Sequence, residues 1–115
     1  MENTAEFPKS SRLLKREEYS SLKKGSSSIT GNGFKIVFKK NNVVKPRLGL
    51  AVSSSIGNAV CRNKVKRLVR ESFRVSKNLV KVDYLFIPRK GIKLVVLRAS
   101  LERTFLKIKE NINGI

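Results

Sequence analysis

Lysine and arginine recur between Gly57 and Lys77 at the spacing of one helix face. From Arg62 to Lys77 the chain carries seven of them and a single acid, Glu71. At about 100° per residue, the apolar residues of this segment fall on one side of the helix and most of the cations on the other. A solvated helix face usually mixes both signs of charge. The pattern therefore predicts a helix that packs by one face and binds a polyanion by the other.

The candidate polyanion contacts are Arg62, Lys64, Lys66, Arg67, Arg70 and Arg74, with Asn63 among them. Arginine suits this chemistry because its guanidinium can donate two parallel hydrogen bonds to one phosphate. Asn63 could bond a base edge or a sugar, or it could simply face solvent.

The composition agrees with a polyanion partner. The chain has 115 residues and a net charge of +18, from 26 lysines and arginines against 8 acids. Such an excess repels itself in a compact state, so a neutralising partner is implied, with nucleic acid the first candidate and an anionic membrane surface the second. With 40% apolar residues, we expect one folded domain over 1–115, flexible only at 1–10.

Catalytic chemistry is poorly represented. The chain has no histidine and only one aspartate, Asp83, and the adjacent pair Glu17 and Glu18 suits the start of a helix better than a metal site. We therefore expect neither catalytic residues nor a metal bound by this chain. A single cysteine, Cys61, and an N-terminus without the pattern of a signal peptide predict a cytoplasmic protein.

The elements that would position these residues can be placed from periodicity and capping signals. A helix over 12–23 comes first, and Asn58 and Ser100 are the expected caps of two later helices. The expected strands are a short one at 27–29 and longer ones at 34–40, 47–53 and 82–87, with 94–97 ambiguous between strand and helix. This order predicts an α+β fold in two layers.

The strand at 34–40 alternates between two faces. Phe34, Ile36 and Phe38 point one way, where they could line a cleft or fill the core. Lys35 and Lys39 point the other way and could equally be solvated edge charges.

Four segments together resemble the bacterial ribonuclease P protein component, from about Phe7 to Ile112. The most specific runs from Gly57-Asn58-Ala59-Val60 through Arg62-Asn63 and Lys66-Arg67 to Phe73-Arg74. The other three are the first helix, the run Arg47 to Ser53 and the run Asp83 to Arg89.

This resemblance implies a fold of order αβββαβα, similar to domain IV of elongation factor G, with a left-handed crossover between parallel strands. It implies a protein that assists a large catalytic RNA in cutting the 5′ leader from precursor tRNA. The signature helix would dock on that RNA, and a cleft between the first helix and the sheet would hold the single-stranded leader. Mg²⁺ in the holoenzyme would be bound mainly by the RNA.

The implied leader contacts are Arg12, Tyr19, Lys23, Phe34, Ile36 and Arg47. Tyr19 could stack on a leader base or fill the core, and Lys23 stands where the family commonly carries a second aromatic residue. The partners would be the RNA subunit and precursor tRNA, and neither DNA nor a membrane. A ribosomal or translation-associated RNA-binding protein would share this size and charge and is the alternative.

Overall fold

A computed structural model of the protein describes residues 26–40 and 45–112. The elements are β1 (Ser27–Gly31), β2 (Phe34–Lys40), β3 (Arg47–Leu50), α2 (Ala59–Val75), β4 (Val82–Pro88) and α3 (Leu97–Ile112). Short 3-10 helices at Ser54–Ile56 and Leu94–Val96 precede α2 and α3. The helix expected over 12–23 and the flexible segment expected at 1–10 lie outside the described residues.

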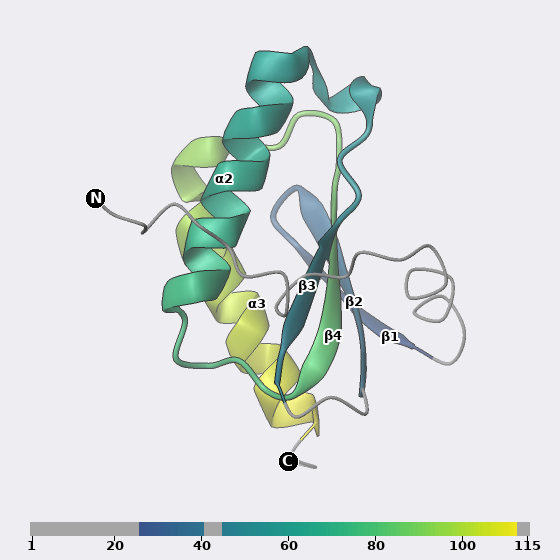
Figure 1. Cartoon of the computed structure of the whole chain (residues 1–115), viewed down its shortest axis with the longest axis vertical. Helices are drawn as coiled ribbons and strands as arrows, with labels where there is room; N and C mark the ends of the chain where they lie inside the picture. Colours follow the sequence, from purple (N-terminus) through teal and green to yellow (C-terminus); the bar gives the residue numbers. More distant parts are fainter. Residues whose placement is uncertain (1–25, 41–44, 113–115) are drawn as a thin grey trace.

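The strands form one sheet in the order β1-β2-β4-β3. β2 pairs antiparallel with both β1 and β4, whereas β3 and β4 are parallel. Both helices cover the same face of this sheet, which leaves the other face without a helix among the described elements (Figure 1). The predicted two-layer α+β fold is therefore confirmed.

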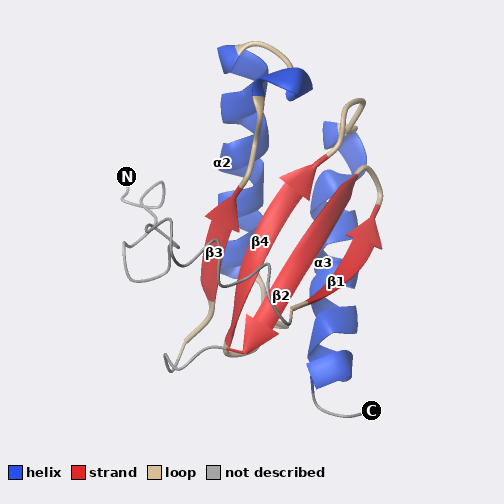
Figure 2. Ribbon diagram, turned by 90° about the vertical axis from the view of Figure 1, so that its right-hand side faces the viewer, coloured by secondary structure: helices blue, strands red, loops and turns tan. Residues whose placement is uncertain are grey.

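The connection from β3 through α2 to β4 is left-handed. With the sheet in front and the helices behind it, β3 and β4 both point upward and β4 lies to the right of β3 (Figure 2). The chain returns downward through α2 behind the sheet, and this path describes a left-handed turn. Most such crossovers are right-handed, so the hand expected from the family resemblance is confirmed against the general rule. The likeness to domain IV of elongation factor G stays a prediction.

Local signals explain where the elements begin and turn. The β1–β2 hairpin turns at Asn32 and Gly33, where glycine takes a φ of 87° that other residues rarely adopt. Asn58 caps α2 as predicted, because its side-chain oxygen accepts a hydrogen bond from the Cys61 amide at 2.9 Å. The helix thus starts at the turn that leads out of β3.

Two predicted boundaries are wrong. Ser100 does not cap α3, which begins earlier at Leu97, directly after the 3-10 turn. The Ser100 hydroxyl instead accepts a hydrogen bond from the Asn32 amide at 3.2 Å and so ties α3 to the β1–β2 turn. The strand expected over 47–53 ends as β3 at Leu50, although the Ala51 amide still donates to the Phe86 carbonyl.

The core between sheet and helices is centred on three aromatic rings. Phe73 of α2, Tyr84 of β4 and Phe105 of α3 pack edge to face, with centroids 5.5 to 6.1 Å apart. All three are buried. The Tyr84 hydroxyl accepts a hydrogen bond from the Val80 amide at 2.9 Å, so this ring also anchors the segment between α2 and β4.

Alkaline pH should destabilise the protein through Tyr84, because burial raises its pKa from 10 to about 12. A raised native pKa contributes stability that is complete below pH 10 and is lost as the pH rises towards 12. The loss reaches about 1.4 kcal/mol at pH 11. In urea unfolding between about pH 8 and pH 11, the stability gap between wild type and Tyr84→Phe should narrow. A gap that stays constant would contradict this assignment.

Candidate RNA interface

The cations of α2 line its outer side. Val65, Val69 and Phe73 are buried against the sheet and α3, which turns the opposite side of the helix to solvent. We call the cationic side of α2 the basic stripe; it consists of Arg62, Asn63, Lys66, Arg67, Arg70 and Arg74. These six residues cover about 140° of the helix circumference at 100° per residue. The structure therefore brings together six of the seven residues that were predicted to bind the RNA subunit.

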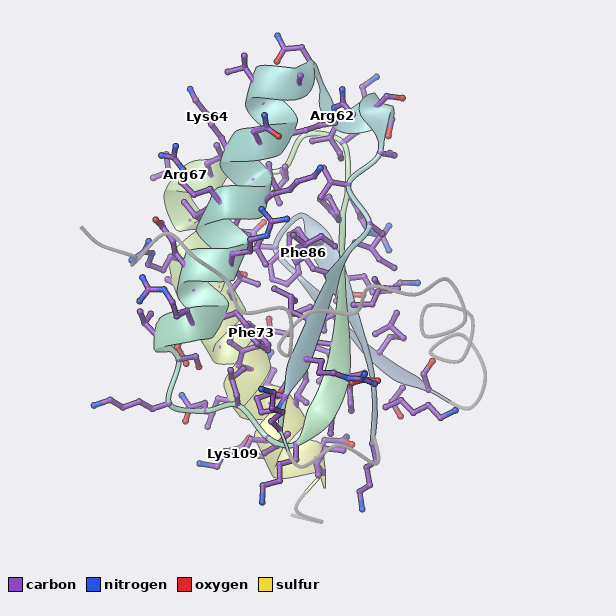
Figure 3. The ribbon with its side chains drawn as sticks, in the orientation of Figure 1. Arg62, Lys64, Arg67, Phe73, Phe86 and Lys109 are labelled. Atoms are coloured by element: carbon purple, nitrogen blue, oxygen red, sulfur yellow. The ribbon has the colours of Figure 1, made fainter. Side chains whose placement is uncertain are left out.

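Lys64 is the seventh predicted contact, and it lies just beyond the Arg67 edge of the stripe. Two positions after Arg62, it stands about 200° round the helix from that residue. Figure 3 shows Arg62 on the side of α2 nearer the sheet, with Lys64 pointing away on the other side. Arg67 lies on the same side as Lys64 in this view, and the two positions are about 60° apart round the helix, so a partner that covers Arg67 can also meet Lys64.

The stripe has a solvent-exposed part and a half-buried part. Asn63, Arg67 and Arg74 are exposed. Arg62, Lys66 and Arg70 are half-buried, one turn apart along the edge of the apolar side. The Arg62 Nε is fully buried without a hydrogen-bond partner among the described residues, so its terminal nitrogens are the atoms that could reach a phosphate.

The one acid on α2 forms an ion pair with a cation of α3. Glu71 accepts a hydrogen bond from Arg98 of α3 at 3.3 Å, on the side where the two helices meet. Its carboxylate is thus paired with a cation that does not belong to the stripe. The resulting surface is positive along the whole length of α2, as a contact for a nucleic-acid backbone requires.

Two predicted leader contacts are wrong. The side chains of Phe34 and Ile36 are 0% and 1% exposed, because they point into the layer between the sheet and the helices. β2 alternates, and its more apolar face is the one that the helices cover. These residues belong to the core, and a leader strand cannot reach them.

The opposite face of the sheet, which we call the open face, carries the other candidates. Arg47 lies there, and its guanidinium forms a two-pronged ion pair with Asp83 on the neighbouring strand, both bonds being 2.8 Å long. The pair joins β3 to β4. Arg47 is thus held in place by a carboxylate before any RNA arrives. Arg12, Tyr19 and Lys23, the remaining predicted leader contacts, lie outside the described residues.

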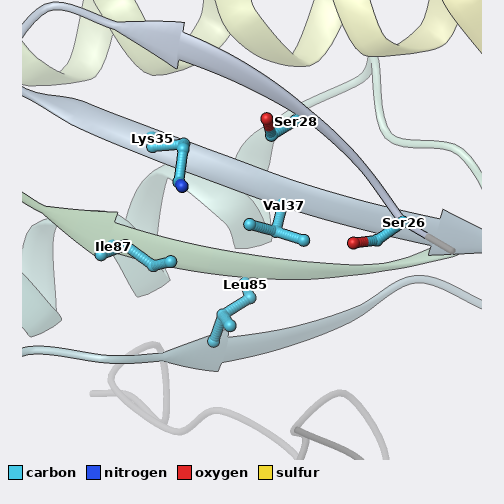
Figure 4. A pocket seen from close by; sticks show the side chains of 6 residues that line it. All are labelled: Ser26, Ser28, Lys35, Val37, Leu85 and Ile87. Atoms are coloured by element: carbon cyan, nitrogen blue, oxygen red, sulfur yellow. The ribbon is translucent and has the colours of Figure 1, made fainter. Parts of the chain in front are cut away.

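The open face also holds a pocket of about 320 Å³. Apolar side chains from β2 and β4 form its floor, with Leu85 buried between Val37 and Ile87. Lys35, opposite Ile87 in the strand register, supplies a positive charge at the wall, and two serines complete the lining (Figure 4). An apolar floor beside a cation and hydroxyl groups can accept a nucleobase together with its phosphate.

The sequence predicted that Lys35 faces away from Phe34, but it did not predict a pocket on that face. The signal was present in the alternation itself. Once helices are assigned to the face of Phe34, the positions between them, Lys35 and Val37, must face the other way. The corresponding positions of β4 are Leu85 and Ile87.

In the described part of the chain, no three potential metal-ligating side chains of histidine, cysteine, aspartate or glutamate come together. Asp83 is paired with Arg47, Glu71 with Arg98, and Glu102 accepts hydrogen bonds from two polar side chains. None of the helices described here has the length and apolar content needed to cross a lipid bilayer.

Comparison with known proteins gives one consistent result. The family model described as Ribonuclease P matches residues 7–111. The ribonuclease P protein component of Shouchella clausii is 37% identical over 88% of this chain and 88% of its own length. The solved ribonuclease P protein of Staphylococcus aureus has a TM-score of 0.77 at 32% identity, over 85% of this chain and 94% of that one.

The ribonuclease P protein of Thermotoga maritima has a TM-score of 0.75 at 31% identity, covering 84% of this chain and 96% of that structure. Sequence and fold thus agree over most of both chains, and the match includes the whole of α2 with its basic stripe. The alternative, a ribosomal or translation-associated protein, finds no support in these comparisons. The chain belongs to the ribonuclease P protein family.

Proposed function

We propose that this protein binds the catalytic RNA of ribonuclease P in the cytoplasm through the basic stripe of α2. The observation that carries the proposal is the charge of that stripe: five cations on one rigid helix, with the nearest acid, Glu71, turned towards α3. Packed against the sheet by Val65, Val69 and Phe73, α2 holds these cations in fixed relative positions. A pre-positioned row of cations loses little side-chain freedom when it meets a phosphate backbone.

We further propose that the RNA performs the hydrolysis and holds the Mg²⁺ that it requires. Metal-assisted cleavage of a phosphodiester needs oxygen ligands that converge on the metal. The four acids among the described residues are dispersed, and three of them are already engaged with other side chains. The absence of histidine from the sequence also leaves no imidazole for acid–base chemistry. The contribution of this chain is then to bind and position RNA.

The 5′ leader of precursor tRNA is proposed to cross the open face of the sheet. The pocket between β2 and β4 offers apolar contact for an unstacked base, and Lys35 offers a partner for its phosphate. The predicted residues Arg12, Tyr19 and Lys23 would add contacts from the first helix. Arg47 would act there mainly as part of its pair with Asp83.

Reconstitution with the matching RNA subunit tests this function. The protein alone should leave a leader-bearing precursor tRNA intact at any Mg²⁺ concentration, whereas protein and RNA together should release the leader at low Mg²⁺, where the RNA alone cleaves poorly. Glu17→Gln and Glu18→Gln variants should support the same cleavage rate as wild type. Cleavage by the protein alone, lost in either variant, would move the chemistry to this chain and refute the proposal.

A further inference from the structure

The end of α2 is secured by contacts from outside the helix. Its C-cap, Ser76, has an extended backbone (φ −68°, ψ 139°), without the left-handed glycine that closes many helices. The cap amide donates to the Phe73 carbonyl at 3.4 Å, which is long for a hydrogen bond between backbone groups. The hydrogen bonds of α2 itself therefore hold its last turn only weakly.

Glu102 of α3 supplies the missing closure. One carboxylate oxygen of Glu102 accepts hydrogen bonds from the Ser76 hydroxyl at 2.6 Å and from the Asn78 side-chain amide at 3.0 Å. The Asn78 backbone amide also donates to the Ser76 hydroxyl at 3.1 Å. We call these three residues, Ser76, Asn78 and Glu102, the clasp. Hydrogen bonds to an ionised carboxylate are stronger than those between neutral groups, so the clasp fixes the chain where α2 ends.

The same segment is anchored a second time, two residues further on. The Val80 amide donates to the hydroxyl of Tyr84, which is itself fully buried. Between these two anchors the connection from α2 to β4 has little freedom. Arg74, an exposed member of the basic stripe, lies only two residues before the clasp. Arg74 thus belongs to the last turn of α2, whose end the clasp holds.

We infer that Glu102 is a positioning residue for RNA binding, which acts by holding the last turn of α2 so that Arg74 meets its phosphate. This inference rests on the proposed function of the stripe. It adds Glu102, a residue of another helix, which would act without touching the RNA. Its carboxylate faces Ser76 and Asn78 and is the group that links α3 to the RNA-binding helix at this point. The other end of α2, capped by Asn58, does not depend on it.

A double-mutant cycle tests the inference. A phosphate contact changes log K by about 0.7 to 0.9 per unit of log salt, which corresponds to about 4- to 6-fold in affinity at 150 mM salt relative to 1 M. Arg74→Gln should therefore weaken binding to the RNA subunit by about that factor, and Glu102→Ala by up to the same factor. The two changes together should cost no more than Arg74→Gln alone, since the clasp acts through Arg74. Glu102→Ala combined with Arg62→Gln should instead show additive losses.

Two further variants separate positioning from a general loss of stability. Glu102→Gln keeps the oxygen that accepts both hydrogen bonds and should bind RNA almost as wild type does. Asn78→Ala removes one donor without altering α3 and should give a smaller loss in the same direction. In the free protein, Glu102→Ala should speed amide hydrogen exchange in residues 72–76 and leave the start of α2 unchanged.

Additive losses from Glu102→Ala and Arg74→Gln, or a folded Glu102→Ala variant with wild-type affinity, would overturn the inference. If Glu102→Ala does not fold, Asn78→Ala in the same cycle decides, with an additive result again overturning it. Wild-type protein that fails to bind the RNA subunit would refute the proposed function instead. The exchange comparison would then show by itself whether the clasp holds the last turn of α2.

Discussion

Replacing Arg67, Arg70 and Arg74 together by glutamine should weaken binding to the catalytic RNA by about 50- to 150-fold at 150 mM salt, if each of the three meets one phosphate. The estimate follows from the release of counterions, which gives about 0.7 to 0.9 units of salt slope per phosphate neutralised. The slope of log K against log salt should therefore fall by about two to three units. Glutamine retains the length and helix propensity of arginine, so α2 should stay intact.

A matched triple variant shows whether position or total charge matters. Arg103, Lys107 and Lys109 lie on α3 and carry the same number of charges. Changing them to glutamine removes the same charge from the protein and leaves the basic stripe complete. This control should lose much less affinity and keep most of the salt slope. Equal losses in the two triple variants would show that RNA responds to the net charge of +18 and not to the stripe.

The basic stripe could be predicted from the sequence because both of its causes are local. The period of the cations and the capping side chain of Asn58 act within one helix, and the structure agrees with both. Lys64, which was predicted together with its neighbours, lies at the edge of the stripe, about 60° beyond Arg67. All the basic residues of this motif were predicted to form one surface.

The open face was harder to predict because it depends on which side of the sheet the helices cover. The alternation in β2 divides Phe34 from Lys35 correctly, but by itself it does not say which group meets solvent. The two layers decide this through long-range packing. Two long-range contacts could not be predicted from any local pattern. The ion pair of Arg47 with Asp83 joins residues 36 positions apart, and the contact of Glu102 with Ser76 joins residues 26 positions apart.

The left hand of the crossover could be predicted only from the resemblance to the family. Periodicity and capping signals give the order of elements, and the general rule for parallel strands favours the opposite hand. The hand matters for the function that we propose, because it places α2, which carries the basic stripe, behind the β3 side of the sheet (Figure 2). Among residues 26–40 and 45–112, no helix covers the open face of the sheet.

The open face should show its role most clearly in Lys35→Glu. If the leader passes the pocket, this change removes one phosphate contact and adds a repulsion of similar size, which together weaken binding of a long-leader precursor by about 15- to 30-fold. A precursor with a one-nucleotide leader should bind the reconstituted enzyme as before. The measurement is the ratio of the two affinities at a fixed salt concentration.

Lys40→Glu is the control of this experiment for net charge, and Arg47→Ala is its control for stability. Lys40 is exposed at the end of the same strand but belongs to the alternate set of positions, so its reversal changes the net charge equally without entering the pocket. Arg47→Ala removes the ion pair that joins β3 to Asp83 of β4, and we expect it to lower stability and to affect both substrates alike. A Lys35→Glu variant that loses affinity equally for long and short leaders would instead place Lys35 at the contact with the RNA subunit. In that case the leader would have to follow another path across the protein.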